Sequence, residues 1–472
     1  MGISLNPATL LSGQGLDVSS LVSQILSESS GQLTEWQGEQ TTLQSQASDL
    51  TAINSALTNL ATAVTALADP LGALTAQSAT SSDTGVLTAT ADTSAVAGTH
   101  TVAVSNLATA GAVYTNDFAG GASASILPSG ATSGEIDLQI GGSTGKTQAI
   151  AITPGSNDTL TTLASYINSQ NLGVNASVVT DANGSRLALV SQNTGSAGAL
   201  AITANNTSLS FNTPTGGVNA QLTIDGVPYA SASNTVTGAI PGVTLNLANA
   251  SSGNPVQLTV GPDTVQSTSA INNFVSAYNQ VISDINQEVA YNSATNSQGP
   301  LGSDAAVAQL QSSLLTDAAY SVTGNGGDVN LAALGINTNN DGTLTVDSTQ
   351  LNSALASNPA AVQNFFQNTA STGFANAFNT DLTNLTDPTQ GVLNVDLAQN
   401  KAQQADLTTS ITNFQTQLTA QQAALTLEYS AVNASLQAYP LLLQQVTETL
   451  GTLGSGSSSS SGSSSPTLTS GL

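Results

Sequence analysis

Apolar residues near the N-terminus recur at the three- and four-residue spacing of amphipathic helices. Residues 16–36 form a first such stretch, in which Asp17 is a candidate N-cap and Val18 and Leu21 share one face. The next stretch is more regular. Two interleaved series each repeat every seven residues: Leu43, Leu50, Leu57, Val64 and Leu71, and Ile53, Leu60, Leu67 and Leu74. This alternation predicts an a/d seam of about four heptads.

The seam has two possible structural settings. Pro70 and Gly72 should end its helix near Ala68, because proline cannot continue a helix interior. The positions that flank the seam are Ala, Thr, Ser and Asn, without the Glu/Lys pairs that select partners in a two-stranded coil. A helix packed in a bundle is therefore favoured over a free two-stranded coiled coil, which stays open.

From about residue 75 to about residue 260 the pattern changes to short alternating runs. Val86–Thr90 and Thr99–Val104 are examples, and turn dipeptides such as Gly141-Gly142, Asn183-Gly184 and Asp225-Gly226 separate the runs. These features predict β-hairpins. One helix is expected inside the block, over Thr159–Gln170.

Helical spacing returns after the β-rich block. It predicts helices over Ile271–Ile285, Ala305–Leu315 and about Leu351–Phe366, with a hairpin at Gly335–Val346. A last long helix is expected from about Ala402 to Leu450, with Pro440 kinking or breaking it. Its apolar stripe is Leu407, Ile411, Phe414, Leu418, Leu425, Val432, Tyr439 and Val446.

The predicted fold class is α+β and multidomain: long N- and C-terminal helices form a coiled-coil or helix-bundle stalk, and β-rich head domains are inserted between them. The expected divisions are an N-terminal arm at 1–42, partly disordered alone; a helical stalk domain at 43–74 and 263–401; a β-rich head at 75–112 and 218–262; a second head inserted at 113–217; a C-terminal helical arm at 402–453; and a disordered Ser/Gly tail at 454–472.

The charge balance limits the classes of partner that the protein can be expected to bind. Charged residues make up 7% of the 472 residues, and the formal net charge is −25, with Lys146, Arg186 and Lys401 as the only basic side chains. Nucleic-acid binding needs several Lys or Arg to displace counterions, so neither nucleic acid nor an anionic membrane is expected as a partner.

Catalytic chemistry has little support. The chain has no cysteine and one histidine, His100, which is expected to be an exposed strand residue without a catalytic partner. The segment Asn337–Gly342 resembles half of an EF-hand loop, but the twelfth position is Ser348 where a glutamate belongs, so a hairpin turn is the better interpretation. We therefore expect no enzyme activity, no metal and no cofactor.

The sequence shows neither the pattern of a cleaved signal peptide nor that of a membrane span. The N-terminus lacks the basic region and apolar run of a cleaved signal peptide, and no continuous apolar stretch approaches the length of a membrane span.

Six motifs, in order along the chain, resemble the bacterial flagellar filament cap, the hook-associated protein 2 family. They are Gly15-Leu16-Asp17-Val18 with Leu21-Val22; Gly98–Ala108; a module of Thr159-Leu160, Ile167-Asn168, Gly173–Val179 and Arg186–Leu189; Ser233–Val236 with Ile240–Leu245; Phe274–Asn279; and Leu334–Ile336 with Asp341–Leu344 and Asp347.

The resemblance implies an extracellular protein at the tip of the flagellum, exported without a cleaved signal peptide through the flagellar type III channel. It implies a homo-oligomeric ring of about four to six subunits and flagellin as partner, with hook-associated junction proteins, an export chaperone and host glycans as further partners. The contact residues expected are the helical seams, namely Leu50, Ile53, Leu57, Leu60, Val64, Leu67, Leu407, Ile411, Phe414, Leu418, Leu425 and Val432, and the terminal motif Gly15, Leu16, Asp17 and Val18.

Two other functions compete with capping. A β-rich head on a helical stalk is also the form of a cell-surface adhesin, and a hook–filament junction protein shares the helical ends. The Ile240–Leu245 and Phe274–Asn279 segments favour the cap.

Overall fold

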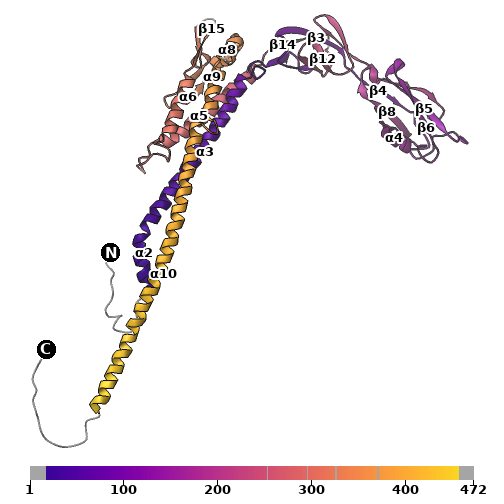
Figure 1. The fold of residues 1–472 in the computed structure, drawn as a ribbon. Coiled ribbons are helices and arrows are strands. Elements are labelled where there is room, and N and C mark those ends of the chain that lie inside the picture. The colour runs from indigo at the N-terminus through magenta and orange to yellow at the C-terminus, as the bar shows by residue number, and fades with distance from the viewer. Residues whose placement is uncertain (1–16, 252, 295, 325–326, 369–371, 456–472) are drawn as a thin grey trace, which may run out of the picture. The chain divides into compact units, whose positions relative to one another are not determined.

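The computed structural model describes residues 17–251, 253–294, 296–324, 327–368 and 372–455. It confirms an α+β multidomain chain in which long terminal helices flank, in sequence, a β-rich middle (Figure 1). The chain forms two compact units. One comprises residues up to Thr58, Gln280–Leu314 and residues from Leu382 onward, and the other comprises Asn59–Asn279 and Leu315–Asp381. The finer division into arms, stalk and heads stays a prediction.

The N-terminal helices have the predicted start and the predicted end, but the stretch predicted over 16–36 is divided at Ser30 between two helices. Helix α2 (Val18–Ser29) follows Asp17, whose carboxylate accepts the backbone N–H of Ser20 at 3.1 Å. Helix α3 (Gly31–Ala68) ends directly before Asp69-Pro70. The cap and the predicted end near Ala68 are therefore confirmed.

In the first unit, α3 runs antiparallel to the long helix α10 (Val392–Ser455). Asn54 Nδ2 donates to Asn394 Oδ1 at 3.3 Å, Gln404 Nε2 donates to the Leu43 carbonyl at 3.2 Å, and Gln40 Nε2 donates to Thr408 Oγ1 at 2.9 Å. Positions closer to the N-terminus of α3 therefore pair with positions closer to the C-terminus of α10. This pairing of helices within the chain favours the bundle over a free coil.

Of the kink or break predicted at Pro440, the break is wrong. The helix continues through it to Ser455. A proline removes one backbone N–H and crowds the carbonyl four residues back, at a cost of about 3 kcal/mol. The flanking Leu and Gln residues are strong helix formers, so helix formation resumes at once on both sides.

In the second unit, the first β-rich body contains the strands β1 (Gln77–Ser81), β2 (Leu87–Ala91), β3 (Gly98–Asn106), β10 (Ala220–Ile224), β11 (Val227–Ser231), β12 (Thr235–Ile240), β13 (Val243–Leu247) and β14 (Val256–Pro262). They form a five-stranded sheet in the order β1-β14-β3-β10-β11 and a three-stranded sheet in the order β12-β13-β2. Fully buried Leu87, Val102, Leu245 and Leu258 belong to one core that joins the two sheets. Asp225 and Gly226 have φ of 52° and 80° and form the predicted β10–β11 turn.

A second β-rich body has its own core. Its sheets are β4-β8-β7 and β6-β5-β9, built from β4 (Ala110–Tyr114), β5 (Gly134–Ile140), β6 (Lys146–Ile152), β7 (Val174–Asp181), β8 (Gly184–Thr194) and β9 (Leu200–Asn205). Helix α4 (Leu160–Ser169) packs on β7 and is capped by Thr159, as predicted. The β7–β8 hairpin is confirmed, but its two-residue loop is Ala182-Asn183, because Gly184 already pairs with Asp181.

The predicted helices after the β-rich block are α5 (Thr264–Val289) and α6 (Ala305–Ala318). The single helix expected over Leu351–Phe366 is wrong. It is two helices, α7 (Ser348–Ser357) and α8 (Pro359–Gln367), divided at Asn358, because a residue before proline is pushed out of the helical region. The sequence reading missed helix α9 (Phe374–Leu385) and the hairpin of β15 (Ser321–Gly324) and β16 (Gly327–Asn330).

The segment Asn337–Gly342 and His100, which were considered for metal binding and catalysis, both have structural roles. The hairpin of β17 (Ile336–Thr338) and β18 (Leu344–Val346) confirms the predicted turn, in which Asp341 Oδ1 accepts the Thr343 N–H at 3.0 Å. His100 lies on strand β3 and is partly buried rather than exposed. It does have a partner, because its Nδ1 lies 2.7 Å from Asp225 Oδ2.

Candidate assembly surface

The predicted N-terminal seam is packed within the chain. Leu50 and Ile53 are 1% exposed, and Leu57, Leu60, Val64 and Leu67 are 0% exposed. Leu71, the last residue of its series, lies after the helix end and is 73% exposed. The helical part of this seam therefore belongs to the protein's own core. Its role in contacts with other subunits stays a prediction.

The first part of the α10 stripe is partly covered by the N-terminal helices. Ile411 is buried, and Leu407, Phe414, Leu418 and Leu425 are partly buried. The ring of Trp36 on α3 meets the ring of Phe414 edge-on at a centroid distance of 5.5 Å. Helix α2 packs along α10, and a groove of ≈ 410 Å³ lies between them, lined by residues that include Leu26 and Leu418.

Beyond Tyr429 the stripe continues, and within the part of residues 17–455 that the structure describes no other segment covers it. Seven large apolar side chains follow at alternating spacings of three and four residues; we call them the distal seam. Their exposed fractions are Val432 43%, Leu436 37%, Tyr439 63%, Leu443 53%, Val446 51%, Leu450 63% and Leu453 73%. A continuous apolar row of this kind marks an interaction site more often than an ordinary surface.

Of the expected contact residues in α10, Val432 alone belongs to the distal seam. Tyr439 and Val446 were predicted as stripe residues, but Leu436, Leu443, Leu450 and Leu453 were not. The signal was present, because the heptad spacing continues past Pro440. The predicted stripe followed one of the two interleaved series and passed over Leu436, Leu443 and Leu450 of the other.

The stripe changes phase before the distal seam. Gln421, Leu425 and Tyr429 are separated by two consecutive four-residue steps, where a heptad pattern alternates three and four. Such a stutter locally unwinds a supercoil and rotates the stripe around the helix. The distal seam is thus set apart, in sequence phase as well as exposure, from the part that α2 and α3 cover.

The distal seam carries almost no charge. Between Tyr429 and Leu453 the only ionisable side chains besides the tyrosines Tyr429 and Tyr439 belong to Glu448. The hydroxyls of Ser435, Thr447 and Thr449 donate to carbonyls four residues back, so the helix itself satisfies them. A partner would therefore be recognised by apolar packing rather than by charge pairing.

The terminal motif is only partly described. Asp17 caps α2 and Val18 is its first residue, half-buried against the chain. Gly15 and Leu16 lie outside the described residues, as do most of the arm before them and residues 456–472 of the tail.

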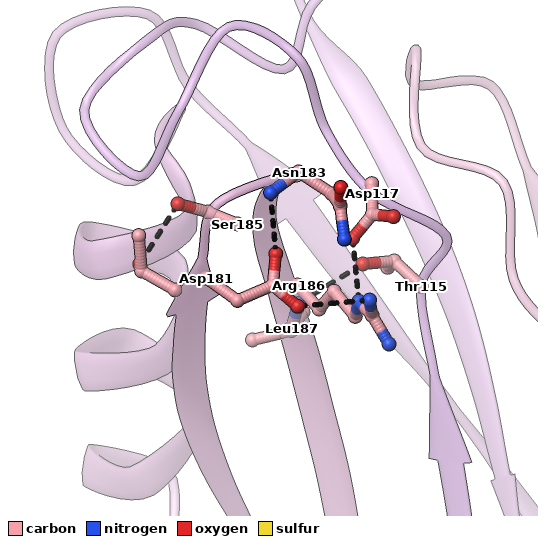
Figure 2. Close-up of polar contacts among 8 residues, drawn as sticks. Thr115, Asp117, Asp181, Asn183, Ser185, Arg186 and Leu187 are labelled. Atoms are coloured by element: carbon pink, nitrogen blue, oxygen red, sulfur yellow. Dashed lines mark hydrogen bonds and ion pairs between the residues drawn. The ribbon is translucent and has the colours of Figure 1, made fainter.

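The only arginine is used structurally, at the tip of the β7–β8 hairpin (Figure 2). Arg186 Nε donates to Asp117 Oδ1 at 2.5 Å, and its Nη2 donates to Asp181 Oδ2 at 3.1 Å. The hydrogen bond and charge of Asp117 raise the pKa of the guanidinium above its usual value. Asp181 Oδ1 also accepts the Asn183 N–H at 2.7 Å. The guanidinium thus ties the segment after β4, which carries Asp117, to the β7–β8 hairpin. It is already neutralised, which makes it a poor site for an anionic ligand.

Neither a metal centre nor a membrane segment is indicated. The described residues contain no group of three or more His, Cys, Asp or Glu side chains that could hold a metal ion. Among them one helix, Gly31–Ala68, is long and apolar enough to cross a membrane by length and composition. The core helix of a soluble protein meets the same criteria, and the buried seam of α3 fits that simpler explanation.

Three family models match the chain. The flagellar hook-associated protein 2 N-terminus matches residues 14–111, the flagellin hook IN motif matches residues 137–193, and the flagellar hook-associated protein 2 C-terminus matches residues 217–439. The C-terminal match includes α10 as far as Tyr439, so it covers the start of the distal seam.

Individual proteins agree with the family models. The B-type flagellar hook-associated protein 2 of Pseudomonas aeruginosa is 29% identical over 69% of this chain and 73% of that protein. The flagellar hook-associated protein 2 of Helicobacter pylori is 30% identical over 31% of this chain and 22% of its own length. The crystal structure of the D1-D2-D3 domains of the flagellar cap protein FliD from Escherichia coli is 28% identical, with a TM-score of 0.57, and covers 75% of this chain and 99% of that one. The chain belongs to the flagellar hook-associated protein 2 family.

Proposed function

We propose that this protein caps the growing flagellar filament: as an oligomer at the distal tip, it promotes folding and addition of flagellin and prevents the loss of flagellin subunits. The observation that carries this proposal is the uncovered distal seam. An exposed helix with an apolar row suits docking of another helix, which is how a subunit with few charges can be ordered by packing alone. Family membership and the flagellar cap protein of similar fold support the assignment.

The protein acts outside the cell in this proposal. It is exported without a cleaved signal peptide, forms a ring of about four to six subunits, and contacts flagellin through the distal seam. Contacts with hook-associated junction proteins and with an export chaperone would use the same terminal helices. No step needs a catalytic group or a cofactor, because assembly is driven by binding.

The test is complementation of a strain that lacks this gene. We expect the deletion strain to shed flagellin monomers into the medium and to lack filaments, and the wild-type gene to restore filaments. A variant with Leu443→Gln, Val446→Gln and Leu450→Gln should be exported but should not restore them. These substitutions keep the helix and remove the apolar row.

A matched variant on other faces of α10 provides the control. Gln437→Asn, Gln444→Asn and Gln445→Asn change exposed polar side chains of the same segment and should restore filaments. Normal filaments in the deletion strain would refute capping. Full complementation by the seam variant would show that capping does not require the distal seam.

An adhesin is the second candidate, and one surface favours it. On the sheet β4-β8-β7, Tyr114 is 41% exposed, Val179 55% and Val190 41%, and the strand register places all three on one face. An aromatic and apolar sheet face is a possible platform for host glycans. Binding of the whole protein to a glycan array, abolished by Tyr114→Ser, would support this role, and an array without binding would count against it.

A further inference from the structure

Helix α6 is bordered at both ends by a carboxyl group that faces a second carboxyl group. At its N-terminus, Asp304 faces Asp396 of α10 in the first unit. In its last turn, Asp317 faces Asp381 of α9 in the second unit. The chain has 28 acidic residues and only three basic ones, and no basic side chain is among the groups acting on either pair.

The pair at the end of α6 contains a buried atom without a donor. Asp317 Oδ2 is buried and has no hydrogen-bond partner unless a proton lies between the carboxyls. Asp381 is exposed. Asp381 is the side chain that acts on Asp317. The charge of Asp317 in turn acts on the phenol of Tyr278 on α5, which is fully buried. A buried, unpaired carboxylate beside another carboxylate is costly, so the proton belongs on Asp317.

The pair at the start of α6 has a similar arrangement. Asp304 Oδ1 accepts the N–H groups of Ala306 at 2.7 Å and Val307 at 3.2 Å, which caps helix α6. Asp304 and Asp396 both line a small cavity of ≈ 60 Å³, whose other polar lining residues are amides such as Gln46, Gln399 and Asn400. No lining residue is basic, so the proton of this pair belongs on Asp396.

We propose that these two carboxyl pairs form a proton-dependent clamp that holds helix α6 to α9 at one end and to α10 at the other. Each pair holds one proton when the helix is docked. Loss of these protons leaves like charges in contact and loosens both ends of α6. The clamp is independent of the capping function proposed above, because it concerns the cohesion of the helices and not the distal seam.

The direction in which pH changes stability follows from the pKa shifts of Asp317 and Asp396. Burial, followed by the hydrogen bond and charge of Asp381, raises the pKa of Asp317 to about 7. Burial, followed by Asp304, raises the pKa of Asp396 to about 6. Both values lie above the unfolded value of 3.8, so the folded chain binds more protons than the unfolded chain. The stabilisation is complete below the unfolded pKa and is lost as the pH rises through about 6 and 7.

The test is the melting temperature of the full chain between pH ~5 and ~8 at constant ionic strength, a window in which ordinary carboxyl groups are already ionised. A His100→Gln background removes the single histidine. In this background we expect the melting temperature to fall as the pH rises. The double variant Asp317→Asn with Asp396→Asn should lose that slope, because each amide supplies its own N–H donor. Asp406→Asn, an exposed aspartate on α10, should keep the slope.

A flat or rising melting temperature in the parent chain would refute the clamp, as would a double variant that keeps the full slope. If the double variant does not fold, the infrared spectrum of the parent chain decides the question. A protonated carboxyl band at pH ~6 that disappears by pH ~9 is expected, and its absence overturns the proposal. A drop in melting temperature at pH ~8 on addition of EDTA would also overturn it, because a divalent cation would then be bridging the carboxylates.

Discussion

At the scale of single residues, an aromatic cluster organises the helical part of the second unit. Phe374 is fully buried and lies 5.5 Å from Phe274, 5.3 Å from Phe365 and 5.5 Å from Phe378 between ring centroids. These rings come from α5, α8 and α9, and α5 is far in sequence from the other two helices. A residue that touches several helices at once fixes their packing, since each ring contact adds to the area that it buries.

Phe374→Ala should lower the free energy of unfolding by about 3–5 kcal/mol, because it removes a large buried side chain and leaves a cavity. Urea denaturation followed by circular dichroism measures this loss. Tyr291→Ala is the matched control: Tyr291 is 63% exposed, so its removal should change stability by less than about 0.5 kcal/mol. Similar losses for the two variants would show that Phe374 does not have the role described.

The aromatic cluster also shows where sequence reasoning stops. The spacing of Phe274 and Tyr278 predicts a helix face, and both are buried. Phe374 and Phe378 were not assigned to any element, because α9 is short and its apolar positions are few. The cluster depends on contacts between distant helices, and one sequence cannot fix which distant faces meet. Asp317 and Asp381 could not be paired from the sequence for the same reason.

At the scale of secondary-structure elements, local signals predicted most boundaries. Asp17, Thr159 and Pro70 start or end helices where their chemistry requires, because caps and prolines act within one turn. Two errors in predicted helix boundaries lie where a proline stands inside a stretch of otherwise helical spacing. The proline after Asn358 was ignored and splits the predicted helix. The break predicted at Pro440 as an alternative to a kink does not occur, and the second apolar series of the distal seam was not recognised.

Pro440→Ala tests how much strain α10 carries at that position. The variant restores one N–H donor and removes the clash with the preceding turn, so the local helix should be more stable by up to about 3 kcal/mol. Hydrogen exchange of the full chain should therefore slow for the amides of 436–444. Ala434→Gly in the same helix should instead speed exchange nearby, at a cost of about 1 kcal/mol. Unchanged exchange in Pro440→Ala would mean that the proline does not weaken the helix.

At the scale of the whole molecule, the charge imbalance governs how copies approach one another. The formal net charge of −25 is set by 28 acidic residues against three basic ones. One of the basic residues, Arg186, is neutralised within the chain by Asp117 and Asp181. Neighbouring subunits in a ring would therefore repel one another over long range, while their apolar surfaces attract at contact.

Oligomerisation of the isolated protein should therefore strengthen as salt is added. Raising the ionic strength from ~0.01 M to ~0.15 M shortens the Debye length from ~30 Å to ~8 Å, which screens the repulsion between subunits and leaves apolar packing unchanged. Sedimentation velocity at both ionic strengths should show a larger oligomeric fraction at the higher one. The triple Gln variant of the distal seam should show the same dependence on salt if the ring is closed by other surfaces, and a reduced oligomeric fraction at both ionic strengths if the seam contributes. Dissociation on adding salt would require specific ion pairs between subunits, which a chain with so few cations is poorly equipped to form.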